Sequence, residues 1–265
     1  MCTLITFHRC IPGAPLVVAA NRDEYRERPA EGPALRDTAA GRVAAPRDLR
    51  AGGTWLGVNR HGTFAALTNR PSACVDPMRR SRGLLVLDAL GTAKASEAAE
   101  WLNGLPAGAY NPFNLFVADA NDAYVAVYEQ AVRVDGLESG VHVIGNADPD
   151  AREVPKIDRL MRRAERAARA EPEAVLDELA AICRAHDGSD GPLSDTCIHV
   201  GDDASGYGTR SSTLLWLGEP GLRSEWRFAD GPPCETVYED RSRLLHELGL
   251  GPGCDGAVRK EGRIS

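Results

Sequence analysis

Short apolar runs separated by turn residues fill the first third of the chain, a pattern typical of β-strands. The runs form two pairs, 3–8 with 16–23 and 53–59 with 63–69. Pro12-Gly13 separates the members of the first pair, and Arg60-His61-Gly62 separates those of the second. Each pair therefore predicts a β-hairpin.

Two later stretches have apolar residues at helical spacing. In residues 83–105 these recur every three or four positions with a break at Gly91-Thr92, which predicts a pair of helices. Residues 155–186 repeat the pattern over a longer block, and Cys183 lies on its apolar face. We therefore expect a second helical region with Cys183 in the hydrophobic core.

Strand character returns between and after the helical stretches. The predicted strands are 113–117, 124–128, 132–134, 141–144, 198–200, 212–217 and 226–228, and a last helix spans 241–248. This order of strands, helices, strands, helices and strands predicts an α+β fold in which helices cover antiparallel sheets. Residues 1–250 contain no linker, so we expect one domain, followed by a flexible tail over 251–265.

The charge balance argues against several classes of function. The 265 residues include 31 Lys+Arg and 38 Asp+Glu, a net charge of −7, with no basic run among aromatics, so no nucleic-acid partner is expected. The longest apolar stretch, Leu16 to Ala20, is far short of a membrane span, and the first residues lack a signal peptide's layout. We therefore expect a cytoplasmic protein that has no transmembrane segment.

Cysteine and histidine spacing gives no metal signature. The seven cysteines include no Cys-x-x-Cys pair, which argues against a disulfide framework and against a four-thiolate zinc site. The six histidines, at positions 8, 61, 142, 186, 199 and 246, are not spaced as metal ligands. We therefore predict no metal site and expect structural roles for these histidines.

Cys2 differs from the other cysteines by its position. Removal of Met1, which is expected before a small residue, would leave Cys2 carrying a free α-amino group. This amine has an ordinary pKa near ~8, so its neutral form can act as a base beside the thiol. N-terminal nucleophile enzymes use this arrangement, and Cys2 is therefore a candidate nucleophile.

The pairing of the first hairpin decides which side chain lies beside Cys2. If the turn at Pro12-Gly13 has no bulge, Cys2 lies opposite Asp23, with the two Cβ atoms ~5 Å apart. A slip of one residue would place Arg22 or Glu24 there instead. Each register brings a charged side chain to Cys2, although the same residues also fit a polar strand end in solvent.

Ordered motifs along the chain carry a family resemblance. They are Met1-Cys2, Ala19-Ala20-Asn21-Arg22-Asp23-Glu24-Tyr25, Arg28-Pro29, Ala51-Gly52-Gly53-Thr54-Trp55-Leu56-Gly57-Val58, Phe64-Ala65-Ala66-Leu67-Thr68-Asn69 and Tyr207-Gly208-Thr209-Arg210-Ser211-Ser212-Thr213. Together they resemble the NRDE family, also called the transport and Golgi organisation protein family, over about residues 1–245. This resemblance implies a fold similar to the N-terminal nucleophile hydrolases, a four-layer αββα sandwich of two antiparallel sheets between helical layers.

The pattern also resembles cysteine hydrolases of the penicillin V acylase and bile-salt hydrolase type. The positions that match their catalytic site are Cys2, Arg22, Asp23, Asn69, Asn146 and Arg210. Those enzymes separate the early Arg from the Asp, whereas the two are adjacent in this sequence. The resemblance therefore leaves open which residue of the Asn21 to Glu24 segment faces Cys2.

The resemblance implies a role for each matching residue. Cys2 would be the nucleophile, and Asp23 would orient its ammonium group. Asn69 and Asn146 would donate hydrogen bonds to the developing oxyanion. Arg210 would keep the thiolate charged or hold a substrate carboxylate.

Each asparagine also fits a simpler role in a turn. Asn69 ends a predicted strand just before Arg70-Pro71, and Asn146 lies among turn residues. Pairing about Arg60-His61 brings Asn69 near Gly52-Gly53, where the missing side chains leave space for a ligand. That space favours a functional role for Asn69 and leaves both interpretations of Asn146 open.

Two functions follow from these residues and the resemblance. The first is a cysteine amidohydrolase that cleaves a small non-peptide amide through Cys2 and requires no cofactor. The second is a carrier without catalysis, because the NRDE family is associated with haem trafficking and with acyl-coenzyme A or lipid homeostasis. In that case the same pocket would bind haem or acyl-coenzyme A.

Overall fold

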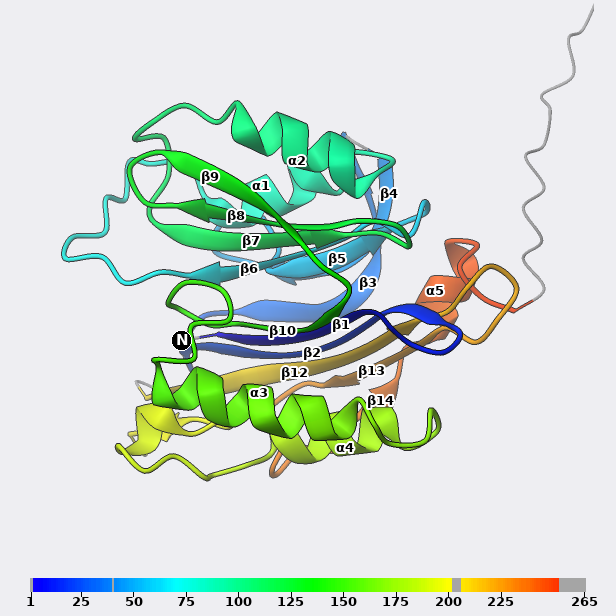
Figure 1. The fold of residues 1–265 in the computed structure, drawn as a ribbon. Coiled ribbons are helices and arrows are strands. Elements are labelled where there is room, and N and C mark those ends of the chain that lie inside the picture. The colour runs from blue at the N-terminus through cyan, green and yellow to red at the C-terminus, as the bar shows by residue number, and fades with distance from the viewer. Residues whose placement is uncertain (1, 40, 202–205, 253–265) are drawn as a thin grey trace, which may run out of the picture.

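Two antiparallel β-sheets lie face to face in the computed structural model, which describes residues 2–39, 41–201 and 206–252 (Figure 1). The first sheet has the order β10-β1-β2-β12-β13-β14, with β11 also paired to β12. Its strands are β1 (Thr3–Ile11), β2 (Ala14–Tyr25), β10 (Gly140–Ile144), β11 (His199–Val200), β12 (Tyr207–Leu217), β13 (Glu225–Ala229) and β14 (Glu239–Asp240).

The second sheet follows the order of the chain from β3 to β9. Its strands are β3 (Ala30–Thr38), β4 (Gly41–Asp48), β5 (Leu56–Asn59), β6 (Phe64–Asn69), β7 (Phe113–Ala118), β8 (Ala123–Tyr128) and β9 (Val132–Leu137). Successive strands pair with their neighbours throughout this sheet, so it is a simple meander.

Helices cover the outer face of each sheet. The helices α1 (Arg82–Ala89) and α2 (Ala95–Asn103) lie on the second sheet, whereas α3 (Pro155–Ala167) and α4 (Val175–Cys183) lie on the first (Figure 1). A short helix, α5 (Arg243–Glu247), contributes Leu245 to the core between the sheets, and Pro192–Ser194 form a 3₁₀ turn. This arrangement confirms the predicted α+β fold and its four-layer αββα sandwich.

Strand β2 is buried on both faces, because helices cover one side and the second sheet covers the other. Val17 and Ala19 pack with α3 and α4, whereas Val18 and Ala20 pack between the sheets. This explains the unbroken apolar run in the sequence of β2. The same alternation continues into the polar end of the strand, where Asn21 and the residues after it are also largely buried.

The register of the first hairpin differs from the simplest prediction. Leu4 pairs with Ala20, and a β-bulge interrupts the pairing between His8 and Ile11. Arg9, within the bulge, has a φ of 52°, in the left-handed region that non-glycine residues rarely adopt. The bulge shifts the register by one residue and brings Cys2 level with Arg22, so the predicted pairing with Asp23 is wrong.

Most of the predicted elements are present. The helical pair breaks where expected, between α1 and α2, and Cys183 is buried in the core. The prediction missed β3 and β4, in which prolines and charged residues interrupt the alternation. The predicted flexible tail falls largely on 253–265, outside the described residues. None of the described helices is long and apolar enough to span a membrane.

Candidate functional site

Cys2 lies half-buried just before β1, at the meeting point of two cavities. We call them the apolar cavity and the arginine cavity after the side chains that line them. Their volumes are about 380 Å³ and about 400 Å³, respectively. A molecule held in either cavity can therefore reach the Cys2 thiol.

The apolar cavity lies beside the start of α3 and the end of β10. Its lining residues are Cys2, Thr3, Pro71, Val143, Gly145, Asn146, Ala147, Val154, Pro155, Lys156, Ile157, Leu160, Asp190, Leu193 and Ser194. Lys156 brings an ammonium group into these mostly apolar surroundings. Its Nζ atom is buried and has no hydrogen-bond partner among the residues that the structure describes, and burial lowers the pKa of this lysine.

The arginine cavity has a contrasting lining. It contains six arginines, namely Arg22, Arg28, Arg50, Arg79, Arg80 and Arg82. Four of these form ion pairs, such as that of Arg28 with Asp48 at 2.7 Å. Arg22 and Arg82 form no ion pair with any residue that the structure describes, so their positive charges are available to an anionic ligand.

Arg22 is held in place by an aromatic ring. Its guanidinium carbon lies 4.4 Å from the centre of the Trp55 ring, on the side of β2 that faces the second sheet. Burial lowers the pKa of Arg22, and the charge of a Cys2 thiolate would raise it. Burial also lowers the pKa of Arg82, and the charge of a Cys2 thiolate would raise it. The Arg82 side chain donates a hydrogen bond to the carbonyl of Pro112 at 2.8 Å. Both arginines therefore lie close enough to stabilise a thiolate at Cys2.

Asp23 is a buried acid on the opposite face of β2, the face covered by helices. Thr209 Oγ1 donates a hydrogen bond to Asp23 Oδ1 at 2.7 Å, and Oδ2 has no partner in the described part of the chain. Burial raises the pKa of Asp23 to about 6, although the charges of Lys156 and Arg22 and the Thr209 hydrogen bond oppose this rise. The free oxygen of Asp23 is therefore able to accept a hydrogen bond from a nearby cation.

The Cys2 thiol is close to Asp23 in space despite the shifted register. Its Sγ lies 3.9 Å from the backbone oxygen of Asp23, to which Tyr207 Oη also donates a hydrogen bond at 3.1 Å. Burial raises the pKa of Cys2 and the charge of Arg22 lowers it, with a net rise. Cys2 is therefore a neutral thiol at rest and needs a base to become a nucleophile.

Asn69 and Asn146 lie beside Cys2, one in each cavity. Asn69 lines the arginine cavity, and Asn146 lines the apolar cavity. They are joined by a short hydrogen bond from Asn146 Nδ2 to the backbone oxygen of Asn69. An amide nitrogen carries two N–H groups, so Asn146 has a second N–H to donate. Both asparagines are therefore placed where the two cavities adjoin.

Arg210 is not brought to this junction. It occupies a bulge in β12, between Thr209, which pairs with Asp23, and Ser211, which pairs with Arg22. It lines neither of the two cavities, and its buried Nε has no hydrogen-bond partner among the described residues. Within the described part of the chain, the cations that interact electrostatically with Cys2 include Arg22, Arg82 and Lys156.

Backbone geometry gives the glycines beside Asn69 a second role, in addition to the ligand space that the sequence predicts. A Cβ atom on Gly53 would lie 2.2 Å from the backbone of Gly83, at the start of α1. Gly53 therefore allows two backbones to approach, and it also lines the arginine cavity together with Asn69. Gly52 has a φ of 74° with nothing near its missing side chain, so its conformation explains the glycine.

Sequence reasoning missed three residues of the site. Thr209 belongs to the Tyr207 to Thr213 motif, which could have pointed to it as well as to Arg210. Lys156 is one of three lysines and follows the proline that begins α3, a weak signal. Arg82 lies in α1, and its sequence surroundings show no sign of its proximity to Cys2.

Sequence comparison finds a family and curated relatives. The family model described as Transport and Golgi organisation 2 matches residues 1–225. The human Transport and Golgi organization protein 2 homolog is 36% identical over 113 residues, which cover 41% of this chain and 40% of that protein. The bovine homolog is 36% identical over 114 residues, covering 39% and 38%. The matched part of this chain thus spans about two fifths of the length of these curated relatives.

Solved structures share the fold at low sequence identity. Penicillin V acylase from Agrobacterium tumefaciens has a TM-score of 0.57 and 13% identity, with 92% of this chain and 87% of that chain covered. The N-acylethanolamine-hydrolyzing acid amidase ortholog of Caenorhabditis elegans has a TM-score of 0.55 and 14% identity, with 82% and 94% covered. These likenesses show the fold, and together with the family match they confirm the resemblance inferred from the sequence motifs.

Proposed function

Because this chain belongs to the Transport and Golgi organisation 2 family and has the fold of the N-terminal nucleophile hydrolases, we propose that it is a cysteine amidohydrolase. Its nucleophile is Cys2, freed by removal of Met1. One observation carries the proposal: a half-buried thiol stands where two cavities meet, beside a buried carboxyl group with a free oxygen. Fold neighbours named as an amidase, an acylase and a bile acid hydrolase support it.

The first half of the reaction forms a thioester. The neutral α-amine of Cys2 takes the thiol proton, and the thiolate attacks the amide carbonyl, forming a C–S bond. Asp23 accepts a hydrogen bond from the resulting ammonium group, and Arg22 and Arg82 stabilise the thiolate before the attack. When the intermediate collapses, the C–N bond breaks and the departing amine takes the proton from the ammonium group.

The second half returns the free enzyme. The α-amine takes a proton from water, the hydroxide attacks the thioester carbonyl, and the C–S bond breaks to release a carboxylic acid. The Cys2 thiolate then recovers its proton. The amide groups of Asn69 and Asn146 donate hydrogen bonds to the oxyanion in both halves, and a single such donor typically contributes about 3 kcal/mol.

The two cavities specify the class of substrate. One side of the amide is apolar and fits among Val143, Ile157 and Leu160. The other side is anionic and binds Arg22 and Arg82, the two arginines of this cavity that form no ion pair with a described residue. We therefore expect a small non-peptide amide with an apolar acyl group on one side of the bond and a carboxylate or phosphate on the other.

Intact-mass spectrometry tests the nucleophile directly. We expect the purified chain to lack Met1, and we expect a panel of N-acyl amides with anionic amine parts to yield an adduct of acyl mass on brief exposure. Cys2→Ala should prevent the thioester, whereas Cys10→Ser, at an exposed cysteine in β1, should retain it. A chain that keeps Met1 in its native host, or an adduct that persists in Cys2→Ala, contradicts the proposal.

A carrier function is the second candidate, and the pairing of an apolar cavity with free arginines favours it. Acyl-coenzyme A is amphipathic and anionic, so its acyl chain and phosphates match the two linings. For haem, Cys2 is the sole thiol or imidazole among the described residues of the apolar cavity, so an axial bond would use that sulfur. Ligand that co-purifies with Cys2→Ala at the wild-type amount, without turnover by the wild type, would favour a carrier of acyl-coenzyme A.

A further inference from the structure

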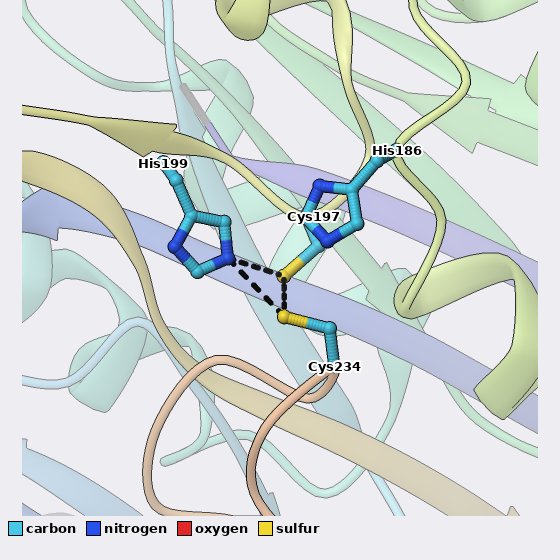
Figure 2. Close-up of side chains that lie close together, drawn as sticks. All are labelled: His186, Cys197, His199 and Cys234. Atoms are coloured by element: carbon cyan, nitrogen blue, oxygen red, sulfur yellow. Dashed lines mark hydrogen bonds between the residues drawn. The ribbon is translucent and has the colours of Figure 1, made fainter.

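Two histidines and two cysteines meet at a place away from Cys2 and its cavities. His186 follows α4, Cys197 precedes β11, His199 begins β11, and Cys234 lies in the loop between β13 and β14 (Figure 2). One ligand atom from each of the four side chains lies within 4.8 Å of all the others. Three segments that are distant in the sequence therefore present four metal-binding groups to one point.

The distances match those around a tetrahedral ion. Cys197 Sγ lies 3.5 Å from Cys234 Sγ and 3.6 Å from His199 Nε2, and His199 Nε2 lies 3.2 Å from Cys234 Sγ. Zinc bonds of about 2.3 Å to sulfur and 2.0–2.1 Å to nitrogen place two sulfurs about 3.8 Å apart and a sulfur about 3.5 Å from a nitrogen. A single zinc ion fits between these three atoms with shifts of a few tenths of an ångström. The His186 nitrogen, which lies within 4.8 Å of them, would move closer by about an ångström to complete the shell.

We propose that His186, Cys197, His199 and Cys234 form a structural zinc site. Two thiolates and two imidazoles complete the tetrahedral shell, with no position left for a water or a substrate, which is typical of a structural site. The geometry explains why cysteine and histidine spacing does not reveal the site: the ligands have no Cys-x-x-Cys or His-x-x-x-His spacing, and folding alone brings them together.

Hydrogen bonds already hold the three segments in position. The backbone N–H of Cys197 donates to the carbonyl of Ala185, next to His186, at 3.0 Å. Arg184 Nε donates to the carbonyl of Pro233, next to Cys234, at 3.1 Å. The four ligands are therefore arranged before an ion arrives, which lowers the cost of ordering them on binding.

The carboxylate of Asp195 lies near the ring of His186. Asp195 Oδ2 lies 3.9 Å from His186 Nδ1, and Asp195 Oδ1 is fixed by the N–H of Gly188 at 2.7 Å. A carboxylate on the far ring nitrogen is a common partner of a metal-bound histidine, because it orients the ring and makes it more basic. This position assigns Nε2 of His186 as the nitrogen that binds zinc.

A disulfide between Cys197 and Cys234 explains less of the arrangement. The sulfurs are 3.5 Å apart, whereas a disulfide bond is about 2.05 Å long. A disulfide would also leave no role for the two imidazoles, whose ring centres are 5.2 Å apart beside the sulfurs. The presence of both histidines favours a metal ion.

Metal binding to the full-length chain tests the site. The protein, purified under reducing conditions, should contain about one zinc per chain. Stripped protein titrated with Co²⁺ should develop the visible bands of tetrahedral cobalt and a thiolate-to-cobalt charge-transfer band. Cys234→Ser should lose the charge-transfer intensity of one thiolate and weaken binding at least about 100-fold, and Asp195→Asn should weaken it about tenfold. Cys74→Ser, an exposed cysteine elsewhere, should bind as the wild type does.

Three outcomes would overturn the site. The first is cobalt binding without a thiolate band, and the second is unchanged affinity in Cys234→Ser. The third is a chain mass two hydrogens lower, with a Cys197–Cys234 cross-link, in protein purified with reductant present. His186→Ala gives a second variant in case Cys234→Ser fails to fold, because the His186 side chain is 46% exposed and its removal leaves the core intact.

Discussion

The two cysteine sites of this protein differ in what surrounds the sulfur. Cys2 lies among buried charges of both signs and opens into two cavities, and no histidine is among the described residues that line them. Cys197 and Cys234 face each other and two imidazoles. A thiol beside a cavity with cations suits a nucleophile, whereas thiols that point at one another and at imidazoles suit a metal ion.

One side chain connects the two sites. Thr209 Oγ1 donates a hydrogen bond to Asp23 and accepts one from the N–H of Ile198 at 2.9 Å. Ile198 lies between the two ligands Cys197 and His199. An ion at the proposed zinc site would therefore fix the segment that holds Thr209 against Asp23. The Cys2 site and the proposed zinc site therefore differ in chemistry but are linked in position through Thr209.

The largest expected effect separates Cys2 from the other cysteines. Cys2→Ala removes the attacking sulfur and should lower kcat/KM for an accepted amide by at least about 10⁴-fold. Cys10→Ala is the matched control, because Cys10 is exposed at the other end of β1. Steady-state hydrolysis by the two variants checks the prediction, and equal losses in both would contradict a role for Cys2 as the nucleophile.

Zinc binding through Cys197 and Cys234 should have a smaller effect, which is an increase in stability. With free zinc at about 1,000 times its Kd, the wild type should gain about 4 kcal/mol, or roughly 10 °C in Tm. Cys234→Ser should lose this gain and Cys2→Ser should keep it, as measured by thermal unfolding of stripped protein with and without zinc. Loss of the gain in Cys2→Ser, or its survival in Cys234→Ser, would remove the distinction between the two sites.

Asp23 predicts a pH dependence of stability. Its pKa in the folded chain, about 6, lies above its ordinary 3.8, so the folded state holds the proton more tightly than the unfolded state does. This stabilisation is complete below about pH 4 and is lost as the pH rises through 6, a change of about 3 kcal/mol. Asp23→Asn lacks this titrating proton. The unfolding free energy of the variant minus that of the wild type should therefore increase as the pH rises from 4 to 7.5.

Denaturant unfolding of both proteins across this pH range measures the change. The comparison with Asp23→Asn cancels the contribution of the other titrating groups, provided that the substitution leaves them in place. A constant difference between the two proteins from pH 4 to 7.5 would mean that Asp23 is not the buried acid described here.

The sequence predicted the layers of the fold and the polar end of β2, because apolar periodicity and motif order are local properties. It predicted the wrong register for Cys2, since the bulge at Arg9 depends on a left-handed backbone at a residue that does not favour it. The assignment of residues to the two faces of β2 does not depend on the register, because alternation along a single strand does not depend on its partner. The place of Asp23 near Cys2 therefore depends on two pairings: β1 with β2, whose register the bulge shifts, and β2 with β12, which places Thr209 against Asp23.

Residues that come from distant segments were beyond the sequence. Lys156 lines the apolar cavity because α3 begins beside β10, and Thr209 contacts Asp23 because β12 pairs with β2. The four candidate zinc ligands come from three segments without a recognisable spacing. Motif spacing can reveal ligands only where they share one element or one turn, and none of these sets does.

Lys156 should have the smallest effect, and that effect sharpens the description of the Cys2 site. Its charge opposes the rise in the pKa of Asp23, so Lys156→Met should raise that pKa further, by about one unit. Because the ionised Asp23 orients the ammonium group, the acid limb of kcat/KM should move up by the same amount. Activity should fall about fivefold at pH 6 and little at pH 8.

Lys94→Met, at an exposed lysine before α2, is the control and should leave the pH profile unchanged. A limb that stays in place in Lys156→Met would show that the two buried groups do not interact. A loss that is equal at all pH values would assign Lys156 to the packing of the cavity wall.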